Sequence, residues 1–351
     1  MQSVLERVYS DTSPDRGDIE YLLGLQSPDD LQQLFAFADK VRAEFCGDGI
    51  LLRGLVEFSN YCRNACLYCG LNKQNAGLER YRLTHEEVMD AVKRIAEQNI
   101  RTVVLQSGED DFLEARWLEA IITEIKRNFD MAITLSVGEC TADEYKLWKQ
   151  AGADRYLLKI ETTDEALYRS LHPNMSFRNR RDCLTALRAL GYQVGCGNLV
   201  GVKGQTLRSL ADDILFFKQQ DFDMIGIGLF IPHEATPLRS DPPGDLNLTL
   251  KVLAITRIVT RNAHLPATTA VGSIGEYDAR ITALQAGANV IMPNFTPQPY
   301  KKLYEIYPGK RCIDEAASHC VGCIGAKVKA INRSISSARG DSLKKKHVWA
   351  C

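Results

Sequence analysis

Short apolar runs alternate with longer amphipathic segments along most of this chain. The amphipathic segments carry apolar residues at helical spacing, whereas the short runs are typical of buried strands. Each predicted strand is followed by a predicted helix or a helical gap, which is the pattern of β/α repeats. The predicted strands cover residues 50–59, 101–107, 131–137, 155–161, 192–200, 224–231, 265–271 and 289–295.

Eight β/α units within roughly 250 residues predict a (β/α)8 TIM-type barrel, an α/β fold. Residues 1–49 have a helical pattern and are predicted to form an N-terminal helical segment. No Pro-, Gly- or Ser-rich linker divides residues 50–310, so we expect one barrel there and not two independent domains. Residues 311–351 are predicted to form a C-terminal extension with cysteines and a basic tail.

Polar residues gather where the predicted strands end. In a barrel these strand ends meet on one rim, which is where active sites lie. Seven strands with such residues are hard to explain by core packing alone. The residues are Ser107–Asp110, Gly138–Glu139, Glu161–Thr162, Asn198, Pro232–His233, Thr268–Thr269 and Pro293–Asn294.

The composition is that of an ordinary globular protein, with 45% hydrophobic and 25% charged residues, which excludes a mostly disordered chain. The net charge is −1, from 43 Lys+Arg and 44 Asp+Glu, so a global basic field for nucleic acid is absent. No apolar run approaches the roughly 20 residues of a membrane span. The acidic N-terminus does not resemble a secretory signal. We therefore expect a cytoplasmic protein.

The 11 cysteines are unusual for such a chain, and clustered cysteines there indicate metal or redox chemistry. Cys62, Cys66 and Cys69 follow the first predicted strand with Cys-x3-Cys-x2-Cys spacing. Three thiolates on one loop can hold three irons of a 4Fe–4S cluster, which leaves one iron open. An open iron can chelate S-adenosylmethionine (SAM). The alternatives are a zinc site without its fourth ligand or a chance grouping.

These residues resemble the radical SAM superfamily, with Tyr68 as the aromatic residue before the last cysteine. The resemblance extends to Ser107-Gly108-Glu109-Asp110, which is similar to the Gly-Gly-Glu element that binds the methionine amine, with Ser in place of the first Gly. It implies that Cys62, Cys66 and Cys69 are catalytic cluster ligands. It also implies a set of SAM-binding residues. These are Tyr68, Gly108, Glu109, Ser136, Glu161 at the ribose, Arg180 at the carboxylate, Leu199 and Ile231.

Longer stretches, among them EFSNYCRNACLYCGL, LPATTAVGSI and GANVIMPNFTPQPYKKLYEIYPGKRC, resemble the HydE family of FeFe-hydrogenase maturases from about residue 30 to about residue 325. The resemblance implies a cysteine-ligated iron–CO–cyanide precursor from the companion maturase HydG, attack of the adenosyl radical on the ligand sulfur, and delivery towards the HydF scaffold. Arginines and hydroxyl donors suit such an anion. The substrate-binding candidates are Arg53, Gln106, Ser107, Thr134, Arg155, Met224, Thr268, Thr269, Met292 and Tyr304.

One departure stands in the fourth predicted strand, where Lys159 and Ile160 replace the Arg-His pair that the family often has before Glu161. Lys159 keeps the charge but lacks the planar fork of arginine. Ile160 removes a proton carrier.

A second cysteine group, Cys312-x7-Cys320-x2-Cys323, agrees with the HydE resemblance, which implies a second iron–sulfur cluster, 2Fe–2S or 4Fe–4S, in some members. A zinc site with His319 is the alternative. The tail has three consecutive lysines, Lys344–Lys346, and is predicted to be a solvated end. Docking of maturation partners is the alternative for the tail.

Two other functions remain open. The biotin synthase and methylornithine synthase families share the barrel and the first cysteine group, so a radical mutase or sulfur-chemistry enzyme on a small amino-acid substrate is the second hypothesis. Biotin synthesis would need inner-strand ligands for a sulfur-donor cluster, and Cys196 is the only candidate on a strand. A non-catalytic cluster carrier is the third hypothesis, and it leaves Glu109, Glu161 and Arg180 unexplained.

Overall fold

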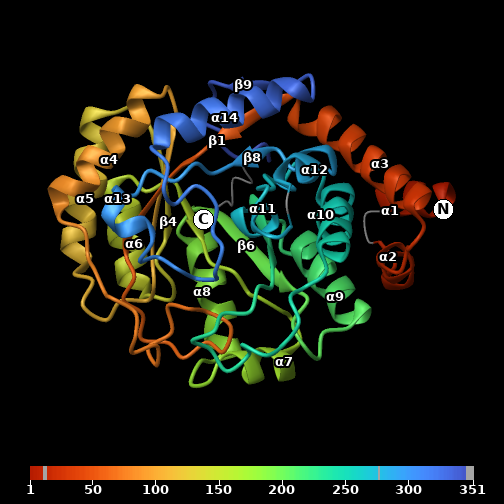
Figure 1. Ribbon diagram of the computed structural model, residues 1–351, viewed down its shortest axis with the longest axis horizontal. Helices are drawn as coiled ribbons and strands as arrows, with labels where there is room; N and C mark the ends of the chain where they lie inside the picture. Colours follow the sequence, from red (N-terminus) through yellow and green to blue (C-terminus); the bar gives the residue numbers. More distant parts are fainter. Residues whose placement is uncertain (11–13, 276, 345–351) are drawn as a thin grey trace.

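The computed structural model describes residues 1–10, 14–275 and 277–344 and contains a barrel of parallel strands surrounded by helices (Figure 1). The strands are β1 (Gly49–Leu52), β2 (Gly54–Ser59), β3 (Thr102–Ser107), β4 (Ala132–Ser136), β5 (Arg155–Leu157), β6 (Gln193–Val200), β7 (Met224–Leu229), β8 (Val290–Ile291) and β9 (Ser334–Ser336). The helices are α1 (Gln2–Ser10), α2 (Arg16–Leu23), α3 (Pro28–Cys46), α4 (His85–Glu97), α5 (Ala115–Asn128), α6 (Ala142–Ala151), α7 (Glu165–Leu171), α8 (Phe177–Ala189), α9 (Leu207–Gln219), α10 (Leu246–Thr260), α11 (Thr269–Ser273), α12 (Arg280–Gln285), α13 (Gln298–Lys301) and α14 (Ala317–Ala330).

The ring of strands closes on itself. Strands β2 to β7 pair in chain order, and β1, which directly precedes β2, pairs with β8 through Leu51 and Val290. The gap between β7 and β8 is bridged by the pairs Met224–His264 and Pro266–Val290. The predicted (β/α)8 barrel is therefore confirmed.

The seventh predicted strand, residues 265–271, is wrong, because this stretch forms no continuous strand. Pro266 forms only an isolated bridge, because proline has no N–H for a continuous ladder. Thr268 then occupies the N-cap of α11, which begins at Thr269. The chain thus turns into a helix at the rim of the barrel.

The outer helices follow from their sequence signals. Thr84 accepts a hydrogen bond from the backbone of Glu87, whose side chain accepts one from the backbone of Thr84 in return, so a capping box starts α4. The helix packs directly on β2, where a Cβ at Gly54 would lie 2.5 Å from Ile95 Cδ1. Glycine therefore permits the close approach of strand and helix.

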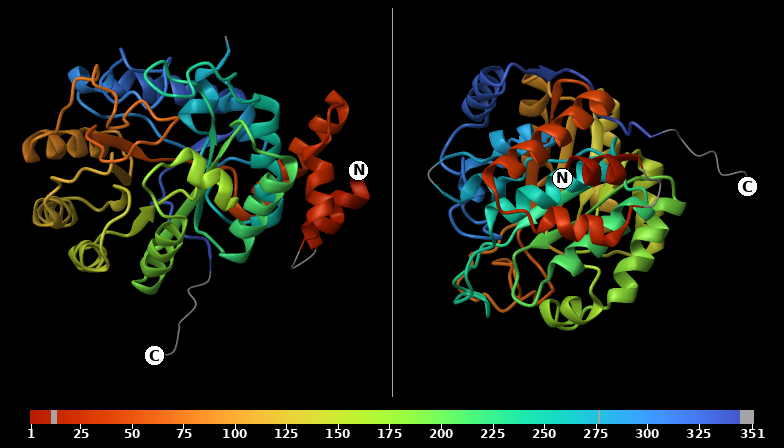
Figure 2. Two further views of the ribbon diagram at one scale, coloured as in Figure 1. Left: turned by 90° about the horizontal axis from the view of Figure 1, so that it is seen from below. Right: turned by 90° about the vertical axis from the view of Figure 1, so that its right-hand side faces the viewer.

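The N-terminal helices α1–α3 lie beside α10 on one flank of the barrel (Figures 1 and 2). Because they cover α10 from outside, that helix is buried along almost its whole length. Even Lys251 is buried there, with its ammonium donating to the carbonyl of Leu25 at 2.8 Å. No helix among the described residues is long and apolar enough to span a bilayer.

After β8 the chain crosses the rim, forms α14, and adds β9 to β1. Residues 338–344, which we name the floor strap, then cross the opposite end of the barrel, where the strands begin. Arg155 donates to the carbonyl of Arg339 at 2.9 Å and to Asp341 at 2.8 Å. Arg53 donates to the carbonyl of Gly340 at 3.3 Å. The strap closes this end of the barrel. The rest of the basic tail, Lys345 and Lys346 included, lies outside the described residues.

Candidate functional site

A cavity of about 350 Å³ lies inside the barrel at the carboxyl ends of the strands. The three cysteines of the first group line it together with most of the residues that the sequence indicated. Those lining residues are Cys62, Cys66, Tyr68, Cys69, Gln106, Ser107, Glu109, Ser136, Glu161, Arg180, Leu199, Ile231, Thr268, Thr269 and Met292.

The cysteines stand on a loop between β2 and α4 that contains no regular structure. Arg80 holds this loop by donating to the carbonyl oxygens of Asn60 at 2.6 Å, Leu71 at 2.9 Å and Asn72 at 2.7 Å. Asn72 in turn donates to the carbonyl of Cys69 at 2.8 Å. Backbone carbonyls that no ladder satisfies are thereby paired, which fixes the loop.

The three thiols suit a cluster better than a single ion. No three His, Cys, Asp or Glu side chains in the described part of the chain surround one metal-ion position. A 4Fe–4S cluster instead takes each thiolate on a different iron, so its ligands are spread apart. Burial, and then the charge of Cys62, raises the pKa of Cys69 to about 12. Burial, together with the charges of Cys69 and Cys62, also raises the pKa of Cys66 well above the usual value of a thiol. Thiolates crowded in this way need a positive partner.

Gly108 supports the loop without lining the cavity. A Cβ there would lie 2.3 Å from the carbonyl oxygen of Tyr61 and 2.8 Å from Cys62 Cβ. Only glycine lets the end of β3 approach the cysteine loop so closely. The same residue therefore places Glu109 next to the cysteines.

Arg180 of α8 lies between two glutamates. Its Nε bonds to Glu139 at 2.6 Å, Nη2 to Glu109 at 3.4 Å, and Nη1 to the carbonyl of Lys159 at 2.9 Å. Burial opposes the charge, but Glu139 and Glu109 outweigh it and raise the pKa of Arg180. The residue predicted to hold the SAM carboxylate thus stands in the cavity as a permanent cation. Its partners are Glu139 and Glu109, which the sequence analysis placed at strand ends without predicting that they pair with Arg180.

Glu161 occupies a strained position four residues after the end of β5. Its φ is 64°, a left-handed value that is costly for a residue with a side chain. Lys159 donates to its carboxylate at 2.8 Å. Asn198 of the neighbouring strand points away and donates to buried Asp213 of α9 at 2.9 Å, so Leu199 faces the cavity instead.

His172 was missed by the sequence analysis. Its Nδ1 lies 2.9 Å from the carbonyl of Tyr168, and its Nε2 lies 2.9 Å from the hydroxyl of Tyr68. A carbonyl only accepts, so Nδ1 carries the proton and the hydroxyl of Tyr68 donates to Nε2. Burial lowers the pKa of His172 to about 4, which keeps the ring neutral. No motif signalled this residue, because it follows a helix far from the cysteines in sequence.

Two further residues that the sequence analysis missed, Glu57 and Lys310, also line the cavity. Lys310 forms a short ion pair with Glu57 of β2, and both residues are buried. Glu57 also accepts from Asn294 at 2.8 Å and from Thr296 at 3.5 Å. The signal for Glu57 was present in the sequence, as a single acid inside an otherwise apolar strand. Lys310 gave no signal.

Five predicted substrate contacts do not line this cavity. Arg53 and Arg155 bind the floor strap at the other end of the barrel. Tyr304 stands behind Gln106, whose amide donates to its hydroxyl at 3.2 Å. Arg53 Nε and Thr134 Oγ1 are buried without a hydrogen-bond partner, so these two atoms near the floor can still form hydrogen bonds. The fifth residue, Met224, lies beside Arg53.

The second cysteine group lies outside the cavity. Cys320 and Cys323 belong to α14, with Cys320 buried and Cys323 exposed. A hydrogen bond from Cys320 lowers the pKa of Cys312 to about 6. His319 on the same helix is exposed. No single-ion site is formed here either, as far as the described residues extend.

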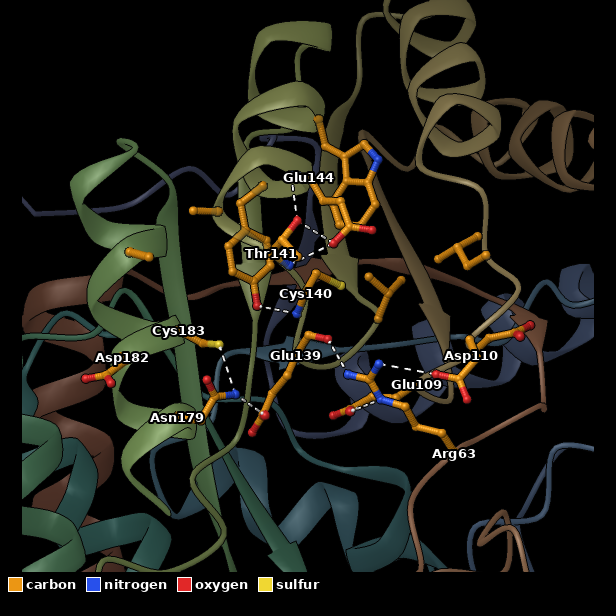
Figure 3. Close-up of a pocket in the computed structure, with 17 residues that line it drawn as sticks. Arg63, Glu109, Asp110, Glu139, Cys140, Thr141, Glu144, Asn179, Asp182 and Cys183 are labelled. Carbon is orange, nitrogen blue, oxygen red and sulfur yellow. Dashed lines mark hydrogen bonds and ion pairs between the residues drawn. The ribbon is translucent and has the colours of Figure 1, made fainter. Parts of the chain in front are cut away.

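A second pocket, of about 500 Å³, lies on the outer side of the same glutamates, between α6 and α8 (Figure 3). Glu109 lines both spaces, and Arg63 of the cysteine loop stands at its edge. Asn179 of α8 donates to Glu139 at 2.5 Å. The glutamates therefore form a wall with polar contacts on both faces.

Comparison with known proteins gives consistent results. The profile of the Radical SAM superfamily matches residues 56–217. The chain is 47% identical over 302 residues to the FeFe hydrogenase maturase subunit HydE of Thermotoga maritima, covering 86% of each. It is 30% identical over 277 residues to a 3-methylornithine synthase of Methanosarcina acetivorans, covering 78% of this chain and 77% of the relative. The solved structure of methylornithine synthase (PylB) matches at a TM-score of 0.85 and 27% identity, covering 96% of this chain and 98% of its own.

Proposed function

Because this chain belongs to the HydE family of the radical SAM superfamily, we propose that its substrate is a cysteine-ligated iron carrying CO and cyanide, used in assembly of the FeFe-hydrogenase H-cluster. The chain is a radical SAM enzyme of the HydE type. Its cofactors are accordingly a 4Fe–4S cluster and SAM. The substrate and the roles of individual residues are the new part of the proposal.

In this proposal Cys62, Cys66 and Cys69 hold the cluster, whose reduced form supplies the electron that cleaves SAM to a 5′-deoxyadenosyl radical. The carboxylate of Glu109 accepts the SAM amine, and Arg180 faces the SAM carboxylate. Burial in the barrel excludes water and strengthens these ionic contacts. Neutral His172 holds Tyr68 in place without adding charge beside the sulfonium.

Glu161, Leu199, Ile231 and Ser136 complete the SAM site in this proposal, because all of them line the same cavity. Glu161 faces the ribose hydroxyls. The strained backbone at this residue is supported by ladder contacts to Gly197 at 3.1 Å and Leu199 at 2.9 Å. Strain that neighbouring structure maintains is typical of functional positions.

The observation that favours an anionic substrate is the Glu57–Lys310 pair. Glu57 is already bonded to Lys310, Asn294 and Thr296. Lysine has three N–H donors, and two of them are engaged, with Glu57 and with the carbonyl of Tyr304 at 3.3 Å. The pair therefore offers a donor to the cavity rather than an acceptor. A cyanide ligand or a cysteine carboxylate accepts from such a donor, and a free ammonium group does not.

The remaining wall agrees with this substrate. Thr268, Thr269, Gln106 and Ser107 bring further polar groups to the cavity, and Met292 brings a thioether. We also keep Arg53, Thr134 and Arg155 as candidates for a second anion position near the floor, because polar atoms of Arg53 and Thr134 are unpartnered there.

The proposal includes HydG as the source of the precursor and HydF as the receiver of the product. It also includes a cytoplasmic location, because free cysteine ligands persist in a reducing compartment. The Cys312, Cys320 and Cys323 group is kept as a candidate for a second iron–sulfur cluster.

The alternative function is radical chemistry on a small amino-acid substrate, in the manner of a methylornithine or biotin synthase. The relation to 3-methylornithine synthase favours it. That function needs an unengaged carboxylate for the substrate amine. Glu57 and Glu161 are the carboxylates in the cavity apart from Glu109, and each is bonded to a lysine.

The test is anaerobic reconstitution with iron and sulfide, reduction, and addition of SAM with and without the iron–CO–cyanide–cysteine precursor. Release of 5′-deoxyadenosine and formation of an adenosine–sulfur adduct are measured. Cleavage stimulated by the precursor, with the adduct, is the expected result. Cleavage that ignores the precursor but responds to an amino acid would favour the alternative.

A further inference from the structure

Arg63 of the cysteine loop contacts the loops that follow β3 and β4. It directly follows Cys62, and its backbone N–H donates to the carbonyl of Glu109 at 2.8 Å. Its guanidinium reaches Glu109 at 3.4 Å, Asp111 at 3.3 Å and the carbonyl of Glu139 at 3.1 Å. Figure 3 shows Arg63 beside Glu109 at the edge of the outer pocket. One side chain thus joins the cysteine loop to the ends of both β3 and β4.

The contribution of these contacts to folding stability does not explain why they are formed. The side chain of Arg63 is 45% exposed, and exposed ion pairs contribute little to folding. A solvated arginine on a loop would have no reason to bond three acceptors from two other loops. The arrangement is better explained by what it holds in place.

The group held in place is the carboxylate of Glu109. It lies between two guanidinium groups, those of Arg63 and Arg180, each at 3.4 Å. Contacts of this length fix its position but leave it free to form a short bond with a ligand. The glycine at 138 makes room for it, since a Cβ there would lie 1.8 Å from Glu109 Cγ.

We propose that Arg63 is a positioning residue that sets the place of the Glu109 carboxylate relative to the cysteine loop, and thereby the affinity for the amine of SAM. The inference rests on the proposed role of Glu109. An amine that must reach both an iron and a carboxylate binds well only when the distance between those two partners is fixed. Arg63 links the two, because it belongs to the loop that would hold the cluster and its guanidinium contacts the carboxylate of Glu109 at 3.4 Å.

The test measures SAM binding and not turnover. Cluster-loaded wild-type protein and Arg63→Met are compared by anaerobic equilibrium dialysis with SAM and with its analogue lacking the α-amine. Iron and sulfide content serve as the check on loading. We expect about a ten-fold rise in Kd for SAM in Arg63→Met, equal to about 1.4 kcal/mol, and no change in Kd for the deaminated analogue. Arg63→Lys keeps the charge but not the planar fork of arginine. Its Kd for SAM should lie between those of the wild type and Arg63→Met.

Arg82 provides a matched control. It is also partly exposed and also pairs with the β3–α5 loop, through Asp110 at 2.6 Å, but it does not contact Glu109. Arg82→Met should leave the Kd for SAM within two-fold of wild type.

Three outcomes would overturn the inference. One is an unchanged Kd for SAM in Arg63→Met. Another is an equal loss for SAM and the deaminated analogue, which would make Arg63 merely structural. A third is an equal loss in Arg82→Met. If loaded wild-type protein did not bind SAM at all, the proposed SAM site itself would fail and this inference with it.

Discussion

The two ends of the barrel contain similar residues in different situations. At the rim, Arg180 stands among glutamates beside a cavity. At the floor, Arg53 and Arg155 are equally buried, but the chain's own strap supplies acceptors for both. Arg180 comes from helix α8 at the rim, whereas Arg53 and Arg155 stand where barrel strands begin. A buried arginine inside the barrel therefore does not by itself predict a place in the rim cavity, because at the floor it binds the chain's own backbone instead.

The largest expected effect separates the two cysteine groups. Cys66→Ser removes one of the three proposed cluster ligands, so SAM cleavage should fall below detection. Cys320→Ser lies outside the cavity, and its SAM cleavage should stay near wild type. Release of 5′-deoxyadenosine by the reconstituted proteins measures both. Loss of cleavage in Cys320→Ser would mean that the two groups are wrongly assigned.

At the floor we expect a loss of stability instead. Arg155→Met removes a fully buried guanidinium that donates to Asp341 and to the carbonyl of Arg339, although Thr102 still donates to that carbonyl and Gln193 to Asp341. Because the Asp341 side chain is 47% exposed, water can solvate its charge, and the expected loss is that of hydrogen bonds to a charged group, about 1.5–3 kcal/mol. Urea unfolding of the metal-free protein should show this loss.

Arg188→Met, on outer helix α8, is the control for the floor variant and should change the stability by less than about 1 kcal/mol. A floor variant as stable as wild type would mean that the strap does not depend on Arg155.

The third prediction uses a histidine at each end. His172 is at the rim, and His264 at the floor bonds to the carbonyl of Asp341 at 2.9 Å. Burial lowers the pKa of His172 to about 4 and that of His264 to about 3, where the charge of Arg53 also contributes. Between pH 6.5 and 4 the unfolded chain binds more protons than the native one. The free energy of unfolding therefore decreases as the pH is lowered through that window.

From pH 7 to pH 5 the loss should be about 2 kcal/mol for each histidine. Urea titrations at the two pH values measure it. Each of the variants His172→Gln and His264→Gln should flatten the dependence by about that amount. A dependence as steep as that of wild type in both variants would show that other groups control it.

The smallest expected effect concerns substrate binding at the rim. Lys310→Met should raise the Kd for the iron–CO–cyanide–cysteine precursor about ten-fold, because one charge-assisted hydrogen bond contributes roughly 1.5 kcal/mol. Binding of SAM, measured in the same samples, is the internal comparison. An unchanged Kd for the precursor would remove Lys310 from the substrate site.

The sequence predicts local motifs better than long-range pairings, at the rim as well as at the floor, for a physical reason. Cys62, Cys66, Cys69 and Glu109 belong to local motifs, so their spacing carries the signal. The partner of Lys310 is Glu57, and these two residues are 253 positions apart. No local pattern reports such a pairing.

The same argument explains the errors. Barrel periodicity placed seven strands well because each strand and helix repeats a local pattern. It predicted a seventh strand where the structure has isolated bridges at His264 and Pro266, followed by Thr268 at the N-cap of a short helix at the rim. It also gave no warning of the floor strap, whose acceptors are mostly backbone carbonyls that any sequence could supply.

The floor strap also has a consequence for the order in which the barrel is completed during synthesis. Arg53 and its acceptor at Gly340 are 287 residues apart, and the strands between them emerge first. Contacts of such long range form late, because their loop-closure entropy must be overcome first. The nascent barrel therefore has an open floor while its cysteine loop is already made. The last step in completing the barrel is therefore the binding of residues 338–344 across that opening.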